Sequence, residues 1–355
     1  MSERIDICVI VGNGFDLAAG LGTTTTEFVA RLAVKYGNED TPAGRLAERI
    51  REEGPENWAD FERKLGEYAA TLDQAVPGND IAEEYVGAKS AMEEELVAFI
   101  REKESLIDPD KVEGAAGECL DSLCCWLGAL TDRDRRRILG GFSSPYTFDF
   151  HFVTLNYTSL LDQMIELCGN NNRTSSEGYV EGYRIHECVH AHGDLDGNPI
   201  CGVDLPSQIH SEALSSDESV LETVVKCSTQ EMLGSLDDFR ALELINSAEV
   251  ILVFGCSLGG TDSRWWNAVI KRLKSDSSKR FVVLFSYGFE RKGGTAAGVR
   301  NRINCLKEKL FDSAGMADDE LKAQLFDRIF ILPSDAIISM PASLVVGPSE
   351  SNGRK

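Results

Sequence analysis

Val9-Ile-Val-Gly-Asn-Gly-Phe-Asp-Leu-Ala-Ala-Gly20 is the stretch that decides the fold. The run from Asp6 to Val11 predicts a short strand, and the glycines after it predict a tight turn that leads into a helix. Such a turn brings backbone N–H groups and the positive end of a helix dipole to an anionic ligand. The stretch is not a complete Gly-x-Gly-x-x-Gly, because Phe15-Asp16 stands where dinucleotide folds carry small residues. Its candidate ligand-binding residues are Gly12, Asn13, Gly14, Phe15 and Asp16.

Length and composition predict one globular domain over residues 1–346 and an unstructured tail over residues 347–355. Of the 355 residues, 43% are hydrophobic and 26% charged. The net charge of -22 argues against non-specific nucleic-acid binding and against binding to anionic membranes. We find no signal peptide and no apolar run near the ~20 residues that span a bilayer, so we expect a cytoplasmic protein. The ten cysteines include no Cys-x-x-Cys pair, which favours reduced thiols.

Continuous apolar runs, rich in β-branched and aromatic residues, recur along the chain and alternate with amphipathic helical patterns. Strands of this kind are typical of a sheet covered on both faces. We therefore predict an α/β, doubly wound, mostly parallel Rossmann-like sheet. The predicted strands are Ile5 to Val11, Phe148 to Leu155, Glu187 to His190, Val250 to Phe254, Phe281 to Ser286 and Arg328 to Leu332.

A large helical insertion is predicted after the first strand. Residues from about 27 to 140 show helical periodicity and almost no strand signal. An insertion at this point would lie over the strand ends, as a lid or as a surface for a partner protein or a second copy of the chain. The sequence does not settle the oligomeric state.

Polar motifs follow four of the predicted strands, where ligands bind in open parallel sheets. Besides the first turn they are Thr154 to Thr158, His190 to Asp194 and Phe254 to Asp262. Each has an ordinary explanation when taken alone, such as helix capping by Asn or Asp or a turn histidine. Together they predict a nucleotide pocket. Cys188, His190 and His192 alternate on one strand face, but nothing in the sequence completes a ligand shell, so no metal is expected.

The four motifs, in this order, resemble the bacteriophage abortive infection AbiH family. Its members open with Gly-Asn-Gly-Phe-Asp-Leu-Ala-x-Gly-Leu, matched here from Gly12 to Leu21. Later matches are the Trp-x-Asp-x-Glu segment from Trp58 to Glu62, Asn-Tyr-Thr at Asn156, and His-x-His-Gly at His190. Gly202 to Asp204 and Gly255 to Asp262 complete the set. Cys256 stands where the family carries His before Ser-Leu-Gly.

The family is in turn similar to sirtuin-like NAD-consuming domains of bacterial defence. That resemblance implies an NAD glycohydrolase with Asn156 and His192 as catalytic residues. Asn156 would position water or the ribose hydroxyls, and His192 would accept a proton at neutral pH. It further implies that the first glycine turn holds the pyrophosphate and that Ser257 and Asp262 bind the adenosine end, with Gly255 also a cofactor-binding residue. Asp16 has no counterpart in those domains, and it could serve the nicotinamide ribose.

Three other functions stay open at this point. The pocket could bind a nucleotide or a modified or cyclic derivative without turnover, and signal to a partner through the insertion. A protein deacylase is disfavoured because the zinc-binding Cys pairs of sirtuins are missing. A nuclease would use Asp60 and Glu62, but these fall in a helical stretch in which a solvated face is the simpler interpretation.

Overall fold

The computed structural model describes residues 3–37, 39–54, 58–73, 80–142, 146–169, 173–174, 180–275, 279–290, 294–334 and 343–346. Within these residues the chain forms an α/β fold around one sheet, in which six strands run parallel and a two-residue edge strand is antiparallel. The predicted tail at 347–355 lies outside the described residues. The strands are β1 Glu3–Val11, β2 Tyr146–Thr154, β3 Arg173–Thr174, β4 Val180–His190, β5 Val250–Phe254, β6 Phe281–Ser286 and β7 Ile329–Pro333.

The strand order places a topological switch point beside the first glycine turn. The order across the sheet is β3-β4-β2-β1-β5-β6-β7. Without the short β3, the six parallel strands run 3-2-1-4-5-6, the order of doubly wound dinucleotide-binding folds. The chain therefore leaves β1 toward one side of the sheet for β2 and β4, and toward the other side for β5, β6 and β7. A crevice forms between β1 and β5, where the order reverses.

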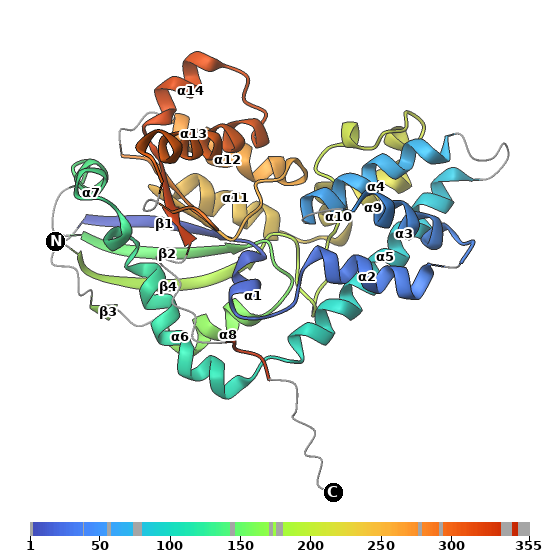
Figure 1. Ribbon diagram of the computed structural model, residues 1–355, viewed down its shortest axis with the longest axis horizontal. Coiled ribbons are helices and arrows are strands. Elements are labelled where there is room, and N and C mark those ends of the chain that lie inside the picture. Colours follow the sequence, from blue (N-terminus) through green and yellow to red (C-terminus); the bar gives the residue numbers. More distant parts are fainter. Residues whose placement is uncertain are drawn as a thin grey trace, which may run out of the picture.

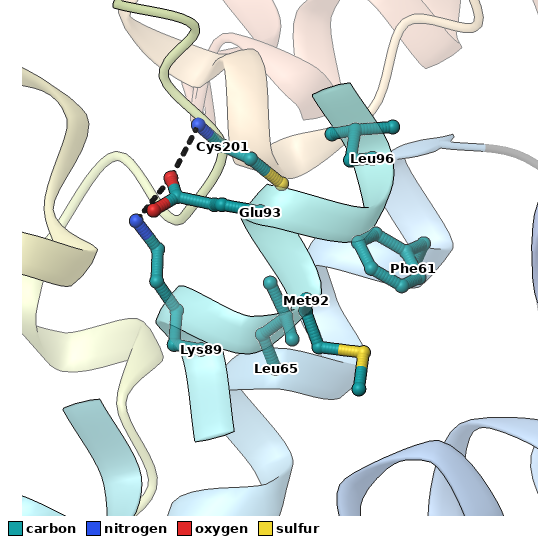
Figure 2. A pocket seen from close by; sticks show the side chains of 7 residues that line it. All are labelled: Phe61, Leu65, Lys89, Met92, Glu93, Leu96 and Cys201. Atoms are coloured by element: carbon teal, nitrogen blue, oxygen red, sulfur yellow. Dashed lines mark hydrogen bonds and ion pairs between the residues drawn. The ribbon is translucent and has the colours of Figure 1, made fainter. Parts of the chain in front are cut away.

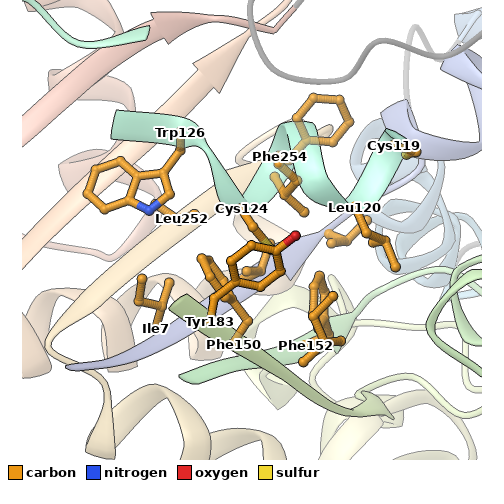
Figure 3. Packing of buried hydrophobic residues seen from close by; sticks show 14 of the residues in the cluster. Ile7, Cys119, Leu120, Cys124, Trp126, Phe150, Phe152, Tyr183, Leu252 and Phe254 are labelled. Carbon is orange, nitrogen blue, oxygen red and sulfur yellow. The ribbon is translucent and has the colours of Figure 1, made fainter. Parts of the chain in front are cut away.

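Helices cover both faces of the sheet (Figure 1). Alternate residues of β1 point to opposite sides, so that Ile7 and Val9 enter one core and Cys8 and Ile10 the other. The first core is closed by α6 Pro109–Cys124 and α8 Leu160–Cys168, and Figure 3 shows the aromatic side chains of β2 packing beneath α6. The second core is closed by α11 Asp237–Ser247, α12 Ser263–Lys274, α13 Ala296–Ser313 and α14 Asp319–Phe326.

A separate layer of helices lies beyond the carboxyl ends of the strands (Figure 1). A third hydrophobic core holds it together, and near Cys201 no water-sized space remains between α4 and α5. Figure 2 shows Phe61 and Leu65 of α4 facing Met92 and Leu96 of α5. The buried face of α5 is an amphipathic stripe of Tyr85, Ala88, Met92, Leu96 and Phe99. The layer's helices are α2 Thr25–Tyr36, α3 Pro42–Glu53, α4 Trp58–Leu72, α5 Ile81–Glu104, α9 Glu218–Val224 and α10 Lys226–Leu233.

The predicted fold class and the helical segment between β1 and β2 are confirmed. The helices of the predicted insertion do not all pack together. Its later part, α6 and α7 Asp132–Leu139, returns to cover the sheet, whereas α9 and α10 join the helical layer from the segment after β4. Hydrophobic periodicity marks each helix, but it carries no information about which core a helix joins. Among the described helices, none is both long and apolar enough to cross a membrane.

The loops after β1 and β5 lie in direct contact at the switch point. The Gly12 N–H donates to Phe254 O, and the Gly14 N–H donates to Gly255 O, both at 2.9 Å. A Cβ atom on Gly14 would lie 2.5 Å from the Gly255 Cα, and one on Gly255 would lie 2.8 Å from Gly12 O. Gly255 also has φ +70°, which side chains rarely adopt. The glycines are therefore needed for the two loops to meet.

Replacing Gly14 with Ala should lower the free energy of unfolding by about 1–3 kcal/mol, because the new methyl overlaps the Gly255 backbone. The matched control is Gly87→Ala in α5, where the added Cβ meets nothing within 4 Å. That change should raise stability by roughly 0.5–1 kcal/mol through helix propensity. Urea unfolding of both variants measures the difference. Equal stability of the two variants would show that the loop contact is not restrictive.

Candidate functional site

A cavity of about 1000 Å³ opens at the carboxyl ends of the strands. Its walls include residues that follow each of the six parallel strands, from His192 after β4 to Ser334 after β7. The helical layer completes it with Thr24, Glu62 and Ile100. Its volume is at the upper end of the ~300–1,000 Å³ typical of ligand pockets. The four motifs that were singled out in the sequence thus all contribute residues to one cavity.

The first turn lines this cavity, but its amide groups are mostly occupied. The Gly12 and Gly14 N–H groups donate to the β5 side, and the Phe15 N–H donates to Gly12 O at 2.9 Å. The Asn13 side chain is bonded to Thr23 through both its amide and its carbonyl, at 2.8 and 2.6 Å. Among the described residues, no acceptor meets the Asn13 main-chain N–H. This N–H is therefore available to an anionic ligand, while the Asn13 side chain fixes the loop.

One predicted binding residue, Phe15, has other surroundings than expected. Phe15 is buried in the sheet core, edge-on to Phe254, and does not line the cavity. Its bulk completes the core, which explains why a large residue stands in this glycine turn. On the β5 side, Gly255, Cys256 and Ser257 all line the cavity, and Ser257 is exposed.

Asp16 is a buried carboxyl group held by two neighbouring side chains. Asn156 Nδ2 donates to its Oδ1 at 3.2 Å, and Thr158 Oγ1 lies 3.0 and 2.9 Å from its two oxygens. Burial raises the pKa of Asp16 to about 7, although the hydrogen bonds from Thr158 and Asn156 act in the opposite direction. Asp16 therefore changes its charge near neutral pH, inside the cavity.

Asn156 is fixed by acceptors on both sides. Its Nδ2 donates to Gly12 O at 3.3 Å as well as to Asp16, and this orients the amide. It does not cap the next helix, which was the alternative considered for it: α8 begins after Ser159. Within the described part of the chain, no donor meets Asn156 Oδ1. This oxygen is free to accept a hydrogen bond from a hydroxyl group or a water molecule.

His192 is buried in the cavity wall that follows β4, and it contacts an indole and a carboxylate. Trp265 Nε1 donates to His192 Nε2 at 3.2 Å, and Asp262 Oδ1 lies 3.2 Å from the same nitrogen. The main chain around it is anchored, since Gln230 Nε2 donates to Ala191 O at 2.7 Å. Asp262 therefore contacts the catalytic candidate, and its side chain does not cap α12. Asp204 takes that role instead, accepting from Ser263 Oγ and Arg264 N.

Cys188 and His190, but not His192, form a possible metal-binding group with Asp162 of α8. One ligand atom of each lies within 4.8 Å of the others. His190 is already paired, with Nε2 2.7 Å from Asp162 Oδ2 and Nδ1 3.0 Å from Asn156 O. Burial alone would lower the pKa of His190, but the bond and the charge of Asp162 outweigh it and raise that pKa. A protonated His190 accounts for this arrangement, and it supports the Asn156 main chain.

Sequence reasoning missed the charged residues that meet behind His192. Lys226, at the start of α10, contacts both Glu62 and Asp262. The solvated-face interpretation of Glu62 is wrong, because Glu62 is 6% exposed. The Asp60 side chain lies outside what the structure describes. A single lysine directly after Val224-Val225 was the one local signal, since a charge in an apolar run needs a buried partner.

The sheet order and the cavity at its switch point define a Rossmann-like α/β protein with a candidate ligand site at the strand ends. Over residues 8–284 the chain matches the family described as bacteriophage abortive infection AbiH. The chain belongs to this family, as its motifs predicted. Comparison with curated protein sequences found no significant match.

The buried Asp16 predicts a pH dependence of stability. The pKa of Asp16 is about 7 in the fold against an ordinary value of 3.8, so the folded state holds a proton that the unfolded chain loses between these pH values. The stability that this proton gives is present below pH 4 and is lost as the pH rises through 7. Asp16→Asn should therefore gain roughly 2–4 kcal/mol over the wild type between pH 4 and pH 8.

Urea unfolding at several pH values tests this prediction. Asp319→Asn, at an exposed position in the first turn of α14, controls for the loss of one negative charge. If the difference in free energy of unfolding between the wild type and Asp16→Asn does not change with pH, Asp16 is ionised in the folded protein over this whole pH range.

Proposed function

We propose that this protein binds NAD in the cavity and hydrolyses the bond between nicotinamide and ribose, and that it acts in phage defence by depleting NAD. The observation that carries the proposal is the shared cavity of Asn156 and His192 at the switch point. From Asn156 after β2 to Ser334 after β7 the sheet takes four steps of ~4.8 Å, which gives a length of about 19 Å. An elongated, two-part ligand suits this shape better than a mononucleotide does.

In the proposed complex the pyrophosphate lies at the first turn, near the Asn13 N–H. The nicotinamide ribose lies beside Asp16 and Asn156, as the buried polar cluster there favours. The adenosine end extends past Ser257 toward the β6 and β7 ends. Asp262 was expected at that adenosine end, but its contact with His192 favours a role beside the reacting bond.

The proposed reaction uses water and releases nicotinamide and ADP-ribose. The bond between the ribose C1′ and the nicotinamide nitrogen breaks, and its electrons neutralise the pyridinium, so no general acid is needed. The oxygen of a water molecule bonds to C1′, and the proton of that water passes to His192. Asn156 Oδ1 accepts a hydrogen bond from the water or from a ribose hydroxyl and so positions it. The transition state resembles an oxocarbenium ion, as in glycoside hydrolysis.

A second candidate function is nucleotide sensing without turnover. It is favoured because both the helical layer and the strand ends contribute residues to the cavity walls. Thr24, Thr25 and Ile100 belong to the helical layer and line the same cavity as the strand ends. A bound ligand would therefore contact both parts and could alter how a partner binds the layer. The nuclease alternative loses support, because the Glu62 carboxylate is paired with Lys226 and is not free to bind a metal ion.

The purified protein should release nicotinamide from NAD, and Asn156→Ala or His192→Ala should slow this about 10²- to 10⁴-fold. His210→Ala is the matched control, because His210 is exposed and lies outside the cavity. Nicotinamide release is measured by chromatography, and ADP-ribose binding by calorimetry. Binding without turnover in the wild type would replace the glycohydrolase by the sensing function. Absence of both NAD loss and binding would overturn the assignment of the cavity.

A further inference from the structure

Four ionisable side chains form a continuous buried chain between the helical layer and the cavity. Lys226 Nζ lies 2.9 Å from each carboxylate oxygen of Glu62 and 2.8 Å from Asp262 Oδ1. Asp262 Oδ1 lies 3.2 Å from His192 Nε2. Glu62, Lys226 and His192 are each 6% exposed or less. The four residues come from α4, α10, the β5–α12 loop and the segment after β4, so only the folded chain assembles them.

The Lys226 ammonium has all its hydrogen-bonding capacity in use. Besides Glu62 and Asp262, it donates to Thr261 O at 3.0 Å, which accounts for its three N–H groups. Burial by itself raises the pKa of Asp262, but Lys226, together with His192, outweighs this and holds that pKa well below its ordinary value. Without Lys226, Asp262 and Glu62 would be buried carboxylates with no cation between them.

Two groups compete for the same nitrogen of His192. The Trp265 indole N–H can only donate, so it favours a bare Nε2, with the ring proton on Nδ1. The Asp262 carboxylate can only accept, so it favours a proton on Nε2. One nitrogen cannot satisfy both neighbours at once. The charge on Asp262 therefore decides which tautomer the ring adopts.

Because Nε2 is in contact with Trp265 and Asp262, the other nitrogen of His192, Nδ1, is the one left for a ligand in the cavity. His192 lines the cavity, and no described residue is hydrogen-bonded to its Nδ1. With the proton on Nε2, Nδ1 presents a lone pair that can take a proton from water. With the proton on Nδ1, as Trp265 favours, the ring cannot act as a base at this position. The reaction thus depends on Asp262 prevailing over Trp265.

We propose that Lys226, anchored by Glu62, is a positioning residue that holds the Asp262 carboxylate against His192 Nε2 and so directs the basic Nδ1 to the cavity. This rests on the proposed function, in which His192 is the base. In this arrangement Asp262 acts beside the reacting bond and not at the adenosine end of the ligand. It also makes the helical layer, through Glu62, a part of the catalytic arrangement.

Lys226→Met tests the proposal against Lys89→Met. Lys89 is also a buried lysine of the helical layer, 1% exposed and paired with Glu93 (Figure 2), but neither residue lines the cavity. Lys226→Met should slow NAD hydrolysis about 10²- to 10⁴-fold while ADP-ribose binding changes less than about threefold. Lys89→Met should keep the rate within about threefold, whatever stability it loses.

A second readout does not depend on turnover. Two-bond ¹H–¹⁵N correlation spectra report which ring nitrogen of His192 carries the proton. We expect Nε2–H in the wild type and in Lys89→Met, and Nδ1–H in Lys226→Met. Asp262→Asn keeps the side-chain volume and removes the charge, and it should give the same change of tautomer if Lys226→Met does not fold.

The outcomes separate the two proposals. An unchanged tautomer in both Lys226→Met and Asp262→Asn, or wild-type turnover in Lys226→Met, would overturn the positioning role. If the wild-type protein does not hydrolyse NAD but the tautomer still changes with Lys226, the proposed function fails and the positioning of His192 stands.

Discussion

The contact between the β1 and β5 loops is the constraint on which the site depends. Gly12 and Gly14 approach Gly255 so closely that no side chain fits between them. This contact closes the floor of the switch point and occupies N–H groups that a phosphate-binding turn would otherwise offer. It also holds Gly12 O where Asn156 can donate to it, so the orientation of the Asn156 amide follows from the meeting of the two loops.

Two polar clusters contribute different chemistry to the cavity. Beside the ends of β1 and β2, Asp16, Asn156 and Thr158 form a hydrogen-bonded cluster in which burial favours the neutral carboxyl group. Behind His192, by contrast, Lys226 outweighs the effect of burial on the pKa of Asp262, and Asp262 stays charged. Two carboxyl groups in one cavity thus have opposite charge preferences because only one of them has a cation beside it.

The sequence predicted what is encoded locally. β5 and β6 have the predicted bounds, because each is an unbroken apolar run that follows a charged residue and is ended by Gly255 or Ser286. The motif residues reached one cavity because parallel strands present their carboxyl ends at one edge. The pair of Glu62 and Lys226 was not predictable, since the two residues stand 164 positions apart and neither lies in an alternating or periodic pattern with the other. The two-residue β3 is too short to give a signal.

A buried charge network of this kind is not explained by stability. Removing a lysine, two carboxylates and an imidazole from water costs several kcal/mol for each ion, and apolar side chains of similar volume often stabilise as well or better. Lys89 and Glu93 show that the helical layer can bury a lysine–carboxylate pair without reaching the cavity. Lys226 differs because its charge acts on Asp262, and through Asp262 on His192. The cost of desolvation is therefore best understood as the cost of fixing one imidazole nitrogen, which only a charge held in one place can do.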